Sequence, residues 1–530
     1  MKFPIGIQTF EEVIGEGYVY VDKTDMVYSL ATEGKIYFLG RPRRFGKSLL
    51  LSTLESYFLG KRELFKGLKI DSLEKEWKTY PVFHMDFNGL DYTDSNTLHK
   101  KLNTFFSDYE AVYGTDERDM TIGDRFAKLL HRAHEKTGQK CVVLIDEYDK
   151  PMLDVMETKR TVSIDGDAMS LEEYNREILR AFYSTFKVAD RDLKFVFLTG
   201  ITKFSQVSIF SGLNQLTDIS MEPQFETICG ITNDEIETYF HEEIAKMADA
   251  NGCAYDMMRK ALRAQYDGYH FSKNMADIYN PFSLLNALRV KDIGDYWFAT
   301  GTPTVLDRML SNSDLDIDEI IAGSYSRDQF MDYRANSLQL LPLFYQSGYL
   351  TIKEFDPNLR TFKLDFPNNE VKNGLVTMVA NSYLKGREDT GNVVRNLVNA
   401  LDRCDLDAFR ECFDTFLASI PYDVRRKSNE RERERDFTYT LYLIFRIASC
   451  YTTYVEKHQS FGRLDCAILT SKCAFVFEFK LDGSAAKALA QINEMGYADE
   501  FRAKGLRVYK IGISIDSDKG RIGDWMVEEA

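Results

Sequence analysis

The sequence predicts an α/β protein in which a parallel sheet covered by helices carries a helical lid and is followed by a second α/β domain. Four short apolar runs, at 36–40, 81–87, 141–145 and 195–200, have the continuous hydrophobicity of strands buried on both faces, as in a parallel sheet between helices. The first run ends in glycine and leads through a basic loop into 48–54, whose apolar positions suit a buried helix. Strand, loop and helix therefore follow one another at the start of the sheet.

The length and composition indicate a folded protein of several domains. At 530 residues the chain exceeds what one hydrophobic core usually organises, and at roughly 150 residues per domain about two to four domains are expected. Hydrophobic residues at 44% and charged residues at 28% are ordinary for a folded chain.

The net charge of −15 excludes a protein that coats nucleic acid through a generally basic surface. Polynucleotide contacts must be local, and there are two candidates: Arg41 with Arg43 and Arg44, and the run 425–435, which mixes charges like a solvated helix face or linker.

The cysteines and the first residues bear on the cellular compartment. The 8 cysteines are scattered between Cys141 and Cys473 and form neither a Cys-x-x-Cys pair nor a ligand spacing with histidine. We therefore expect no disulfide framework, no zinc site and a reducing compartment. The first residues lack a basic flank followed by an apolar core, and no apolar run reaches the ~20 residues of a membrane helix. A cytoplasmic protein without membrane contact is expected.

Three regions are predicted along the chain. Residues 1–220 hold the four expected strands and form the α/β core. Residues 221–385 form a helical lid or connector, in which a helix starts at Asn233 after the N-cap Thr232. Alternating runs in this region predict a small hairpin, as in a winged-helix-like element, at 348–352 and 361–364.

Residues 386–530 are predicted to form the second α/β domain. The region begins with helical patterns, and 441–449 has the composition of an apolar helix. Two strand-like runs follow, at 465–469 and 474–479. A helix from near Ser484 and a closing strand at 508–513 complete the expected domain.

The basic loop after the first strand has the parts of a phosphate-binding loop. Such a loop needs a glycine where backbone amides face phosphate oxygens, a lysine that reaches the β and γ phosphates, and a hydroxyl that holds magnesium. Gly46, Lys47 and Ser48 supply these parts in the right order. The first glycine of the usual G-x-x-x-x-G-K-[ST] pattern is replaced by Arg41, with Gly40 one position early, so the loop is not of the standard kind. The residues predicted to contact the nucleotide here are Arg43, Arg44, Phe45, Gly46, Lys47, Ser48 and Leu49.

A pair of acids supports a nucleotide site. The apolar run 141–145 ends in Asp146 and Glu147. Asp146 can hold magnesium through water, together with Ser48, and Glu147 can polarise the attacking water. The alternative, a buried strand that merely ends in solvated acids, is weakened by the lysine and hydroxyl upstream. Thr199, at the end of the fourth expected strand, is placed either to sense the γ-phosphate or to cap the following helix.

Several of these segments resemble the AAA-like ATPase family common in bacterial genomes. They are Arg-Pro-Arg-Arg-Phe-Gly-Lys-Ser at 41–48, Leu-Ile-Asp-Glu-Tyr-Asp at 144–149, Thr-Gly-Ile-Thr-Lys-Phe at 199–204 and Tyr-Asp-Gly-Tyr at 266–269. The match covers roughly the first 300 residues, judged against ordinary domain sizes. The arginine-rich loop is itself typical of that family. The resemblance implies ATP as the nucleotide, whereas the residues alone do not distinguish ATP from GTP.

Near the C-terminal end, three residues have the pattern of a metal-dependent phosphodiesterase. Such a site needs acids that converge on one or two divalent ions and a group that positions or deprotonates water. Asp465 starts one expected strand and Glu478 ends the next, so these predicted metal ligands can meet if the strands form a hairpin. Strand alternation puts Lys480 on the same face as Glu478. The alternative is that they are the polar ends of an amphipathic hairpin, because Asp-x(n)-Glu-x-Lys alone often arises by chance.

The surroundings of this pattern resemble the PD-(D/E)xK nuclease superfamily, and specifically the C-terminal module often joined to the AAA-like ATPase. Gly462 and Arg463 precede the first strand, the apolar run 474–477 forces Glu478 to emerge from a core strand, and Gln491 lies on the next helix. The resemblance implies a restriction-endonuclease-like α/β fold. Some members take a further acid from the preceding helix, and the spacing does not choose between Glu456 and Asp436.

Two functions are compatible with these patterns. The leading hypothesis is an ATP-dependent, magnesium-dependent nuclease, in which ATP binding and hydrolysis reposition the helical connector and activate the C-terminal site on DNA or RNA. The alternative is an ATP-switched interaction or signalling protein whose nuclease-like module only binds nucleic acid or a partner. A homo-oligomer is compatible with both, since many AAA ATPases complete their site with an arginine from a neighbouring subunit. No arginine of this chain is identified as that residue.

Overall fold

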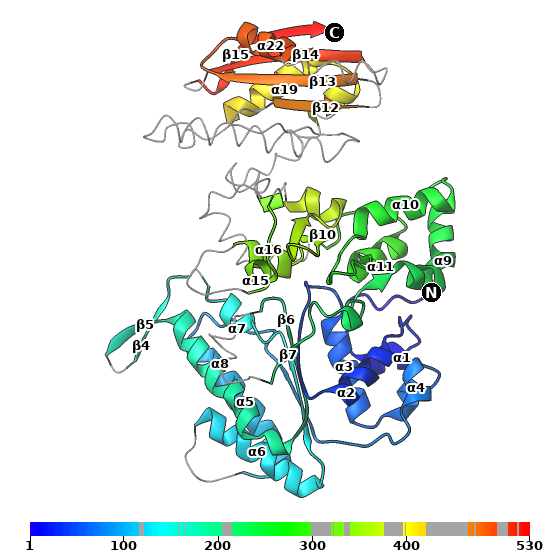
Figure 1. The fold of residues 1–530 in the computed structure, drawn as a ribbon, viewed down its shortest axis with the longest axis vertical. Helices are drawn as coiled ribbons and strands as arrows, with labels where there is room; N and C mark the ends of the chain where they lie inside the picture. Colours follow the sequence, from blue (N-terminus) through cyan, green and yellow to red (C-terminus); the bar gives the residue numbers. More distant parts are fainter. Residues whose placement is uncertain are drawn as a thin grey trace. The chain divides into compact units, whose positions relative to one another are not determined.

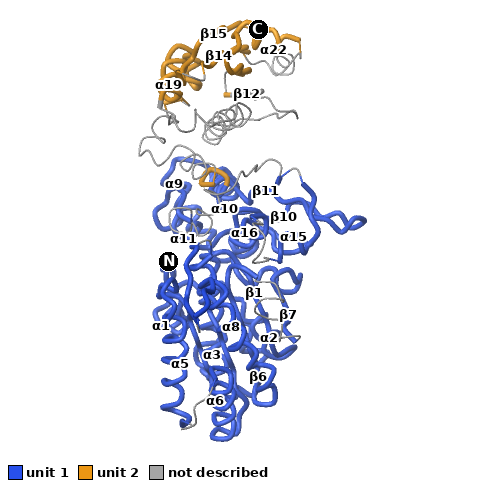
Figure 2. The backbone as a smooth tube through the Cα atoms, turned by 90° about the vertical axis from the view of Figure 1, so that its left-hand side faces the viewer, with its two compact units in different colours: residues 1–371 blue, residues 372–530 orange. Residues whose placement is uncertain are grey.

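The computed structural model divides into two compact units, residues 1–371 and residues 372–530 (Figure 2). The structure describes the whole chain apart from residues 116–120, 157, 165, 204–214, 298–319, 322, 333–339, 376–395, 398, 420–464, 471–472, 495–506, 517–518 and 530.

The first unit is built on a five-stranded parallel sheet with the strand order β2-β3-β6-β1-β7. The four predicted strands are confirmed, because each of the apolar runs forms a strand of this sheet. Strand β3 is buried along its whole length, and β6 is buried except at one residue, as a sheet between two helical layers requires. The short fifth strand was not predicted. The bounds are β1 Ile36–Gly40, β2 Val82–Asp86, β3 Cys141–Asp146, β6 Leu193–Gly200 and β7 Thr217–Asp218.

Helices cover both faces of this sheet (Figure 1). Helix α3, Lys47–Phe58, follows the basic loop directly and lies with α1, α2 and α4 on one side, and α5, α6 and α8 lie on the other. Aromatic side chains join the second layer, where the ring of Phe126 on α6 stacks on that of Phe182 on α8. The remaining bounds are α1 Phe10–Gly15, α2 Thr24–Glu33, α4 Lys69–Leu73, α5 Thr97–Tyr113, α6 Ile122–Thr137, α7 Lys150–Leu153 and α8 Leu171–Val188, with a β4–β5 hairpin of Thr161–Ile164 and Asp167–Ser170.

The helical region belongs to the same compact unit as the sheet. Helix α9 begins at Asn233, as predicted, because the Thr232 side chain accepts a hydrogen bond from the amide of Glu235 and the Glu235 carboxylate accepts one from the amide of Thr232. The predicted hairpin is confirmed as antiparallel β10 and β11. The bounds are β8 Ile231–Thr232, α9 Asn233–Ala250, α10 Tyr255–Tyr266, β9 Ile278–Tyr279, α11 Pro281–Val290, α15 Arg327–Met331, α16 Leu340–Gln346, β10 Thr351–Asp356 and β11 Thr361–Asp365.

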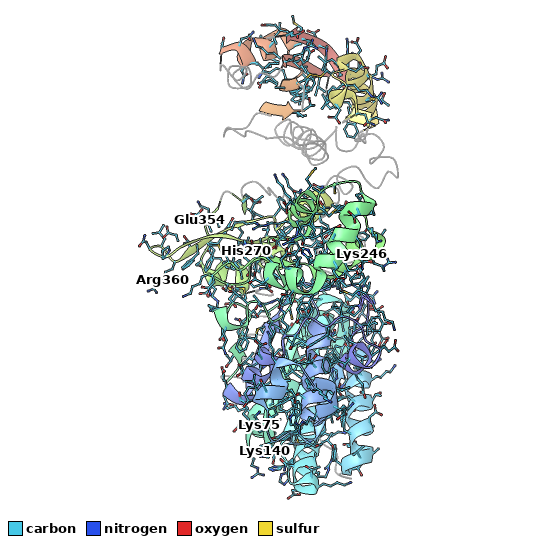
Figure 3. All side chains as sticks on the ribbon, turned by 90° about the vertical axis from the view of Figure 1, so that its right-hand side faces the viewer. Lys75, Lys140, Lys246, His270, Glu354 and Arg360 are labelled. Atoms are coloured by element: carbon cyan, nitrogen blue, oxygen red, sulfur yellow. A yellow bond between two sulfur atoms is a disulfide. The ribbon has the colours of Figure 1, made fainter. Side chains whose placement is uncertain are left out.

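The Tyr-Asp-Gly-Tyr segment joins α10 to the hairpin. Gly268 has φ +90°, and a Cβ there would lie 2.4 Å from the carbonyl oxygen of Pro367, so only glycine fits. His270, labelled in Figure 3, continues the connection, since its Nδ1 lies 2.6 Å from the carbonyl oxygen of Ile352 on β10. Its Nε2 lies 2.8 Å from Asp277. These bonds fix the hairpin against the helices.

The second unit is a four-stranded mixed sheet with the strand order β12-β13-β14-β15. The strands predicted at 465–469 and 474–479 and the helix from near Ser484 are confirmed. The strand predicted at 508–513 is also confirmed, but the prediction that it closes the domain is wrong, because β15 follows it. This edge strand is exposed along most of its length, and its longest apolar run is the three residues 525–527. The bounds are α19 Leu406–Ser419, β12 Asp465–Leu469, β13 Cys473–Leu481, α22 Ala485–Glu494, β14 Arg507–Asp516 and β15 Arg521–Glu529.

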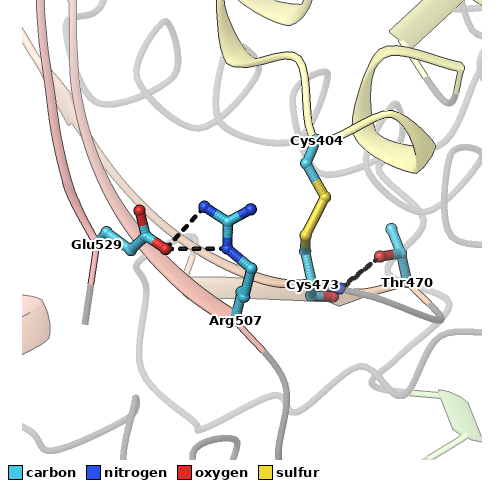
Figure 4. The surroundings of a disulfide bond; sticks show 5 residues. All are labelled: Cys404, Thr470, Cys473, Arg507 and Glu529. Carbon is cyan, nitrogen blue, oxygen red and sulfur yellow. Dashed lines mark hydrogen bonds and ion pairs between the residues drawn. A yellow bond between two sulfur atoms is a disulfide. The ribbon is translucent and has the colours of Figure 1, made fainter.

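A disulfide in this unit corrects the expectation drawn from cysteine spacing. Cys404, just before α19, is bonded to Cys473, the first residue of β13, with their Cα atoms 6.8 Å apart (Figure 4). The Thr470 side chain accepts a hydrogen bond from the Cys473 amide at 2.8 Å. The two cysteines are separated by 69 residues, and only the fold brings them together, so no local spacing announces the pair.

The predicted apolar helix at 441–449 lies outside the described residues. Within the part of the chain that the structure describes, we find no helix that has both the length and the apolar composition to cross a membrane.

Candidate functional site

The first site is built at the end of β1, where the chain turns through the basic loop into α3. Gly46 has φ +92° and Arg44 has φ +66°, both in the left-handed region, before the helix begins at Lys47. A glycine carries such a φ without strain, whereas the arginine requires support from its surroundings. The unpaired amides of the first helical turn and the helix dipole make this end of α3 suited to an anion.

A cleft of about 440 Å³ opens in front of the loop. Of the predicted residues, seven line it: Arg43, Arg44, Gly46, Lys47, Ser48, Leu49 and Glu147. Phe45, Asp146 and Thr199 do not line it. Sequence reasoning missed three other parts of its wall: the N-terminal segment 4–8, Asn88 with Lys150 and Asp154, and Pro281 with Phe282 and Leu285. The apolar side chains of the N-terminal segment and of Phe282 and Leu285 can be read from the sequence, but no local pattern shows that the two segments line the same cleft.

Lys47 is held inside the loop. Its side chain is 4% exposed, and its Nζ donates to the carbonyl oxygens of Arg41 at 3.1 Å and Pro42 at 3.2 Å. The Glu147 carboxylate lies 3.7 Å away. Glu147 itself has φ +49°, a left-handed conformation at the end of β3 that brings the acid to the cleft. The lysine and the acid predicted for phosphate binding and water activation therefore meet.

Asp146 lies behind the cleft, at the last position of β3, next to Ser48. Burial raises the pKa of Asp146 to about 6, and the negative charge of Glu147 acts in the same direction, while a hydrogen bond from Ser48 opposes the shift. A divalent cation would favour the ionised carboxylate again. Serine hydroxyl and aspartate carboxylate are oxygen donors of the kind that Mg²⁺ prefers.

Thr199 and Asp149 lie together beyond these acids. The Thr199 side chain is buried at the end of β6, and its hydroxyl has no hydrogen-bond partner among the described residues. Asp149, which sequence reasoning quoted only as part of a motif, accepts hydrogen bonds from the amides of Ile201 at 2.9 Å and Thr202 at 2.6 Å. Burial raises the pKa of this carboxyl well above its ordinary value. The helix that Thr199 was alternatively predicted to cap would fall at 204–214, outside the described residues.

Arg41 is not available for the polynucleotide contact that the sequence predicts. Arg41 is 1% exposed, and its guanidinium lies 4.1 Å from the centre of the Phe271 ring and donates to the carbonyl oxygens of Ser220 at 2.8 Å and Phe225 at 3.1 Å. Burial lowers its pKa. Phe45 is buried as well, against Tyr269. The other candidate, the run 425–435, lies outside the described residues.

The second site lies in the second unit, on β13. Strand β12 pairs antiparallel with β13, and Asp465 is the register partner of Glu478. Lys480 Nζ donates to Glu478 Oε1 at 2.7 Å and to Gln491 Oε1 on α22 at 2.6 Å. Glu478 is 1% exposed, and its Oε2 has no hydrogen-bond partner among the described residues. A buried carboxylate oxygen without a partner is costly unless a cation or a water completes it.

Gly512 allows helix α22 to approach the sheet closely at this site. It is the register partner of Glu478 on β14, and a Cβ there would lie 2.3 Å from the carbonyl oxygen of Ala485 and 2.9 Å from the amide of Leu489. Helix α22 therefore rests on the backbone of the sheet beside Glu478. This close approach lets Gln491 reach Lys480.

Other predicted members of this site lie outside the described residues. They are Glu456 and Asp436, the candidates for the further acid, and Gly462 with Arg463 before β12. Within the described ranges, no three His, Cys, Asp or Glu side chains gather as a metal-binding group.

The chain was compared with known proteins. A family model described as a predicted AAA-ATPase matches residues 4–210, and one described as the PD-(D/E)XK nuclease superfamily matches residues 432–525. An "Uncharacterized protein in vnfD 5'region" of Azotobacter chroococcum mcd 1 is 33% identical over 538 residues, which cover 99% of each chain. The chain belongs to the AAA-ATPase-like family. This AAA-ATPase-like protein carries a PD-(D/E)XK nuclease superfamily domain in its second unit, and both predicted resemblances are confirmed.

Among solved structures, the AAA-ATPase-like chain aligns with the Orc1 protein of Aeropyrum pernix, solved in complex with DNA. The alignment has 11% identity and a TM-score of 0.23, and it covers 67% of this chain and 90% of that chain. The fold class of this protein is established by its own sheets.

Proposed function

We propose that this AAA-ATPase-like protein binds and hydrolyses ATP in the cleft in front of the basic loop, and that its second unit cleaves DNA or RNA in a metal-dependent reaction. The observation that carries the first half is the meeting of Lys47 and Glu147 at the cleft, with Ser48 and Asp146 directly behind them. The second half depends on the buried, half-partnered carboxylate of Glu478.

The residues of the cleft fit a triphosphate at one end and a base at the other. The amides at the start of α3 and the ammonium of Lys47 would bind the phosphate groups. Ser48 and Asp146 would hold Mg²⁺, which neutralises phosphate charge when bound. Glu147 would orient the attacking water. Residues 4–8 and Phe282 offer the less polar wall that a base requires.

The second unit fits a divalent metal at Glu478. Its free Oε2 and the carboxylate of its register partner Asp465 would be the ligands, and a bound divalent ion stabilises charge on a scissile phosphate. Lys480 is held at this place by Glu478 and Gln491. Its ammonium would position or deprotonate the attacking water.

The ATPase half is tested by turnover and by nucleotide binding. Lys47→Ala is expected to abolish both, because it removes the phosphate-binding cation. Glu147→Gln is expected to keep ATP bound and to stop hydrolysis. Lys187→Ala, on the exposed face of α8, is the matched control and should behave as wild type. Wild-type protein that binds no ATP would overturn this half, whereas ATP occupancy without turnover would identify an ATP-switched interaction protein instead.

The nuclease half is tested by cleavage of single- and double-stranded DNA and RNA with Mg²⁺ or Mn²⁺, with and without ATP. Glu478→Gln and Lys480→Ala are expected to abolish cleavage, and Glu478→Gln is also expected to abolish Mn²⁺ binding in calorimetry. Glu494→Gln, on the exposed end of α22, is the control. If the wild type binds nucleic acid but does not cleave it, the second unit is a binding module and not a nuclease. Sedimentation with and without ATP tests whether the protein forms a homo-oligomer.

A further inference from the structure

The phosphate loop is braced by side chains and backbone of the helical region. A Cβ on Gly348 would lie 2.7 Å from the ring of Pro42, so the backbone there packs directly on the loop. The ring of Phe45 packs edge-on against that of Tyr269, with 4.8 Å between centroids. The indole Nε1 of Trp297 donates to the carbonyl oxygen of Arg43 at 3.1 Å. These contacts fall on loop residues between Arg41, which stands at the position of the usual first glycine, and Gly46.

Trp297 is itself held from the opposite side. It is fully buried, and its backbone amide donates to Oε1 of the buried Glu370 at 2.7 Å. The other oxygen of Glu370 accepts from the hydroxyl of Ser283 at 2.7 Å. Ser283 lies in the first turn of α11, directly after Pro281 and Phe282 in the cleft wall. One carboxylate therefore joins a wall of the cleft to the tryptophan that contacts the loop.

A hydrogen bond to the Arg43 carbonyl oxygen restricts the conformation of the loop at the Arg43–Arg44 peptide group. A peptide unit is planar and trans, so fixing the carbonyl oxygen of Arg43 also fixes the direction of the Arg44 amide. Arg44 has φ +66°, a conformation that a residue with a side chain keeps only when its surroundings impose it. The hydrogen bond from Trp297 acts on the peptide group that leads into this conformation.

We propose that Trp297, oriented by Glu370, is a positioning residue for the phosphate loop. It holds the Arg43–Arg44 peptide group so that the loop keeps its phosphate-binding shape without the usual first glycine, and it ties that shape to α11. The effect on ATP affinity rests on the proposed function, whereas the effect on the loop itself does not.

Trp297→Phe removes the indole donor and keeps an aromatic ring. In protein without nucleotide, hydrogen exchange measured by mass spectrometry is expected to speed up in the peptide that covers 41–48. ATP affinity should fall about 5- to 30-fold, the size of effect that follows when a partly buried carbonyl loses its hydrogen-bond donor. Trp77→Phe is the matched control, because the Trp77 indole nitrogen has no hydrogen-bond partner among the described residues and its ring packs on Phe65, outside the cleft lining. It should change neither quantity.

Glu370 gives a second pair of variants should Trp297→Phe not fold. Glu370→Gln keeps an oxygen for the Trp297 amide and should stay near wild type, whereas Glu370→Ala should show the fast exchange at 41–48 and the weaker ATP binding. Unchanged exchange at 41–48 in both Trp297→Phe and Glu370→Ala would overturn the inference. If the wild type binds no ATP but Trp297→Phe still exchanges faster at 41–48 than the wild type does, the proposed function is wrong and the bracing role of Trp297 stands.

Discussion

Replacing Arg41 by glycine restores the usual pattern of a phosphate-binding loop, yet we expect it to damage the protein. The Arg41 guanidinium donates to the carbonyl oxygens of Ser220 and Phe225 and packs on the Phe271 ring. Arg41→Gly leaves these buried acceptors without their donor and opens a cavity. Each buried acceptor left unsatisfied costs about 1–3 kcal/mol, so the two together cost about 2–6 kcal/mol, a large part of the about 5–15 kcal/mol by which a domain is usually stable.

The assay is urea unfolding of the full chain in a Trp525→Phe background, in which the remaining tryptophans, Trp77 and Trp297, report on the first unit alone. Arg41→Lys is the comparison, because its single ammonium keeps the charge but cannot bond the separate carbonyls as the guanidinium does. We expect the stability order wild type, Arg41→Lys, Arg41→Gly. An Arg41→Gly unfolding free energy within about 0.5 kcal/mol of wild type would refute the reasoning, because changes of that size are typical of surface substitutions.

Three further predictions follow from buried charges and from the disulfide. Because burial raises the pKa of Asp146 to about 6, Mg²⁺ binding in calorimetry should strengthen as pH rises through about 6. The folded state keeps this proton between about pH 4 and 6 while the unfolded chain loses it, so the urea unfolding free energy should fall over that window, and both trends should be absent in Asp146→Asn. Reducing the Cys404–Cys473 disulfide, or replacing both cysteines by serine, should destabilise the second unit by up to about 4 kcal/mol in thermal unfolding, from the entropy of a 69-residue loop. Lys23→Met should cost up to about 3 kcal/mol, because it removes the ammonium that lies 2.5 Å from the Glu235 carboxylate, and the double replacement with Glu235→Met should cost less than the sum in a double-mutant cycle.

The sequence predicted those parts of the fold that have a local signal. Apolar runs of five or six residues were sufficient to find β1, β3 and β6, because a strand buried on both faces is apolar along most of its length. The start of α9 was predictable from one threonine and the acid three residues later. Strand β15 had no such signal, since four of its nine residues are charged and its longest apolar run has three residues.

The parts of the candidate sites that could not be predicted depend on residues far apart in the chain. Three arginines in one loop predicted a basic surface, but Arg41 is buried because carbonyl groups at 220–226 surround it. Trp297 contacts the loop from a more distant position still, and Glu370 in turn contacts Trp297. The pairing of Asp465 with Glu478 was within reach, since it needs only a local hairpin. Their roles remain predictions that the variants above test.

Gly512 has no functional group, and a search for acids and lysines would pass over it. Yet the backbone of α22 sits where a methyl group on this residue would be. In a relative with alanine or a larger residue at this position, the helix equivalent to α22 would have to move away from the sheet. The side chain equivalent to Gln491 would then no longer reach the lysine equivalent to Lys480. Glycine at this position is therefore a simple criterion for sorting homologous sequences into those able to bring the lysine, the glutamate and the glutamine together and those that keep only the sheet and the helix.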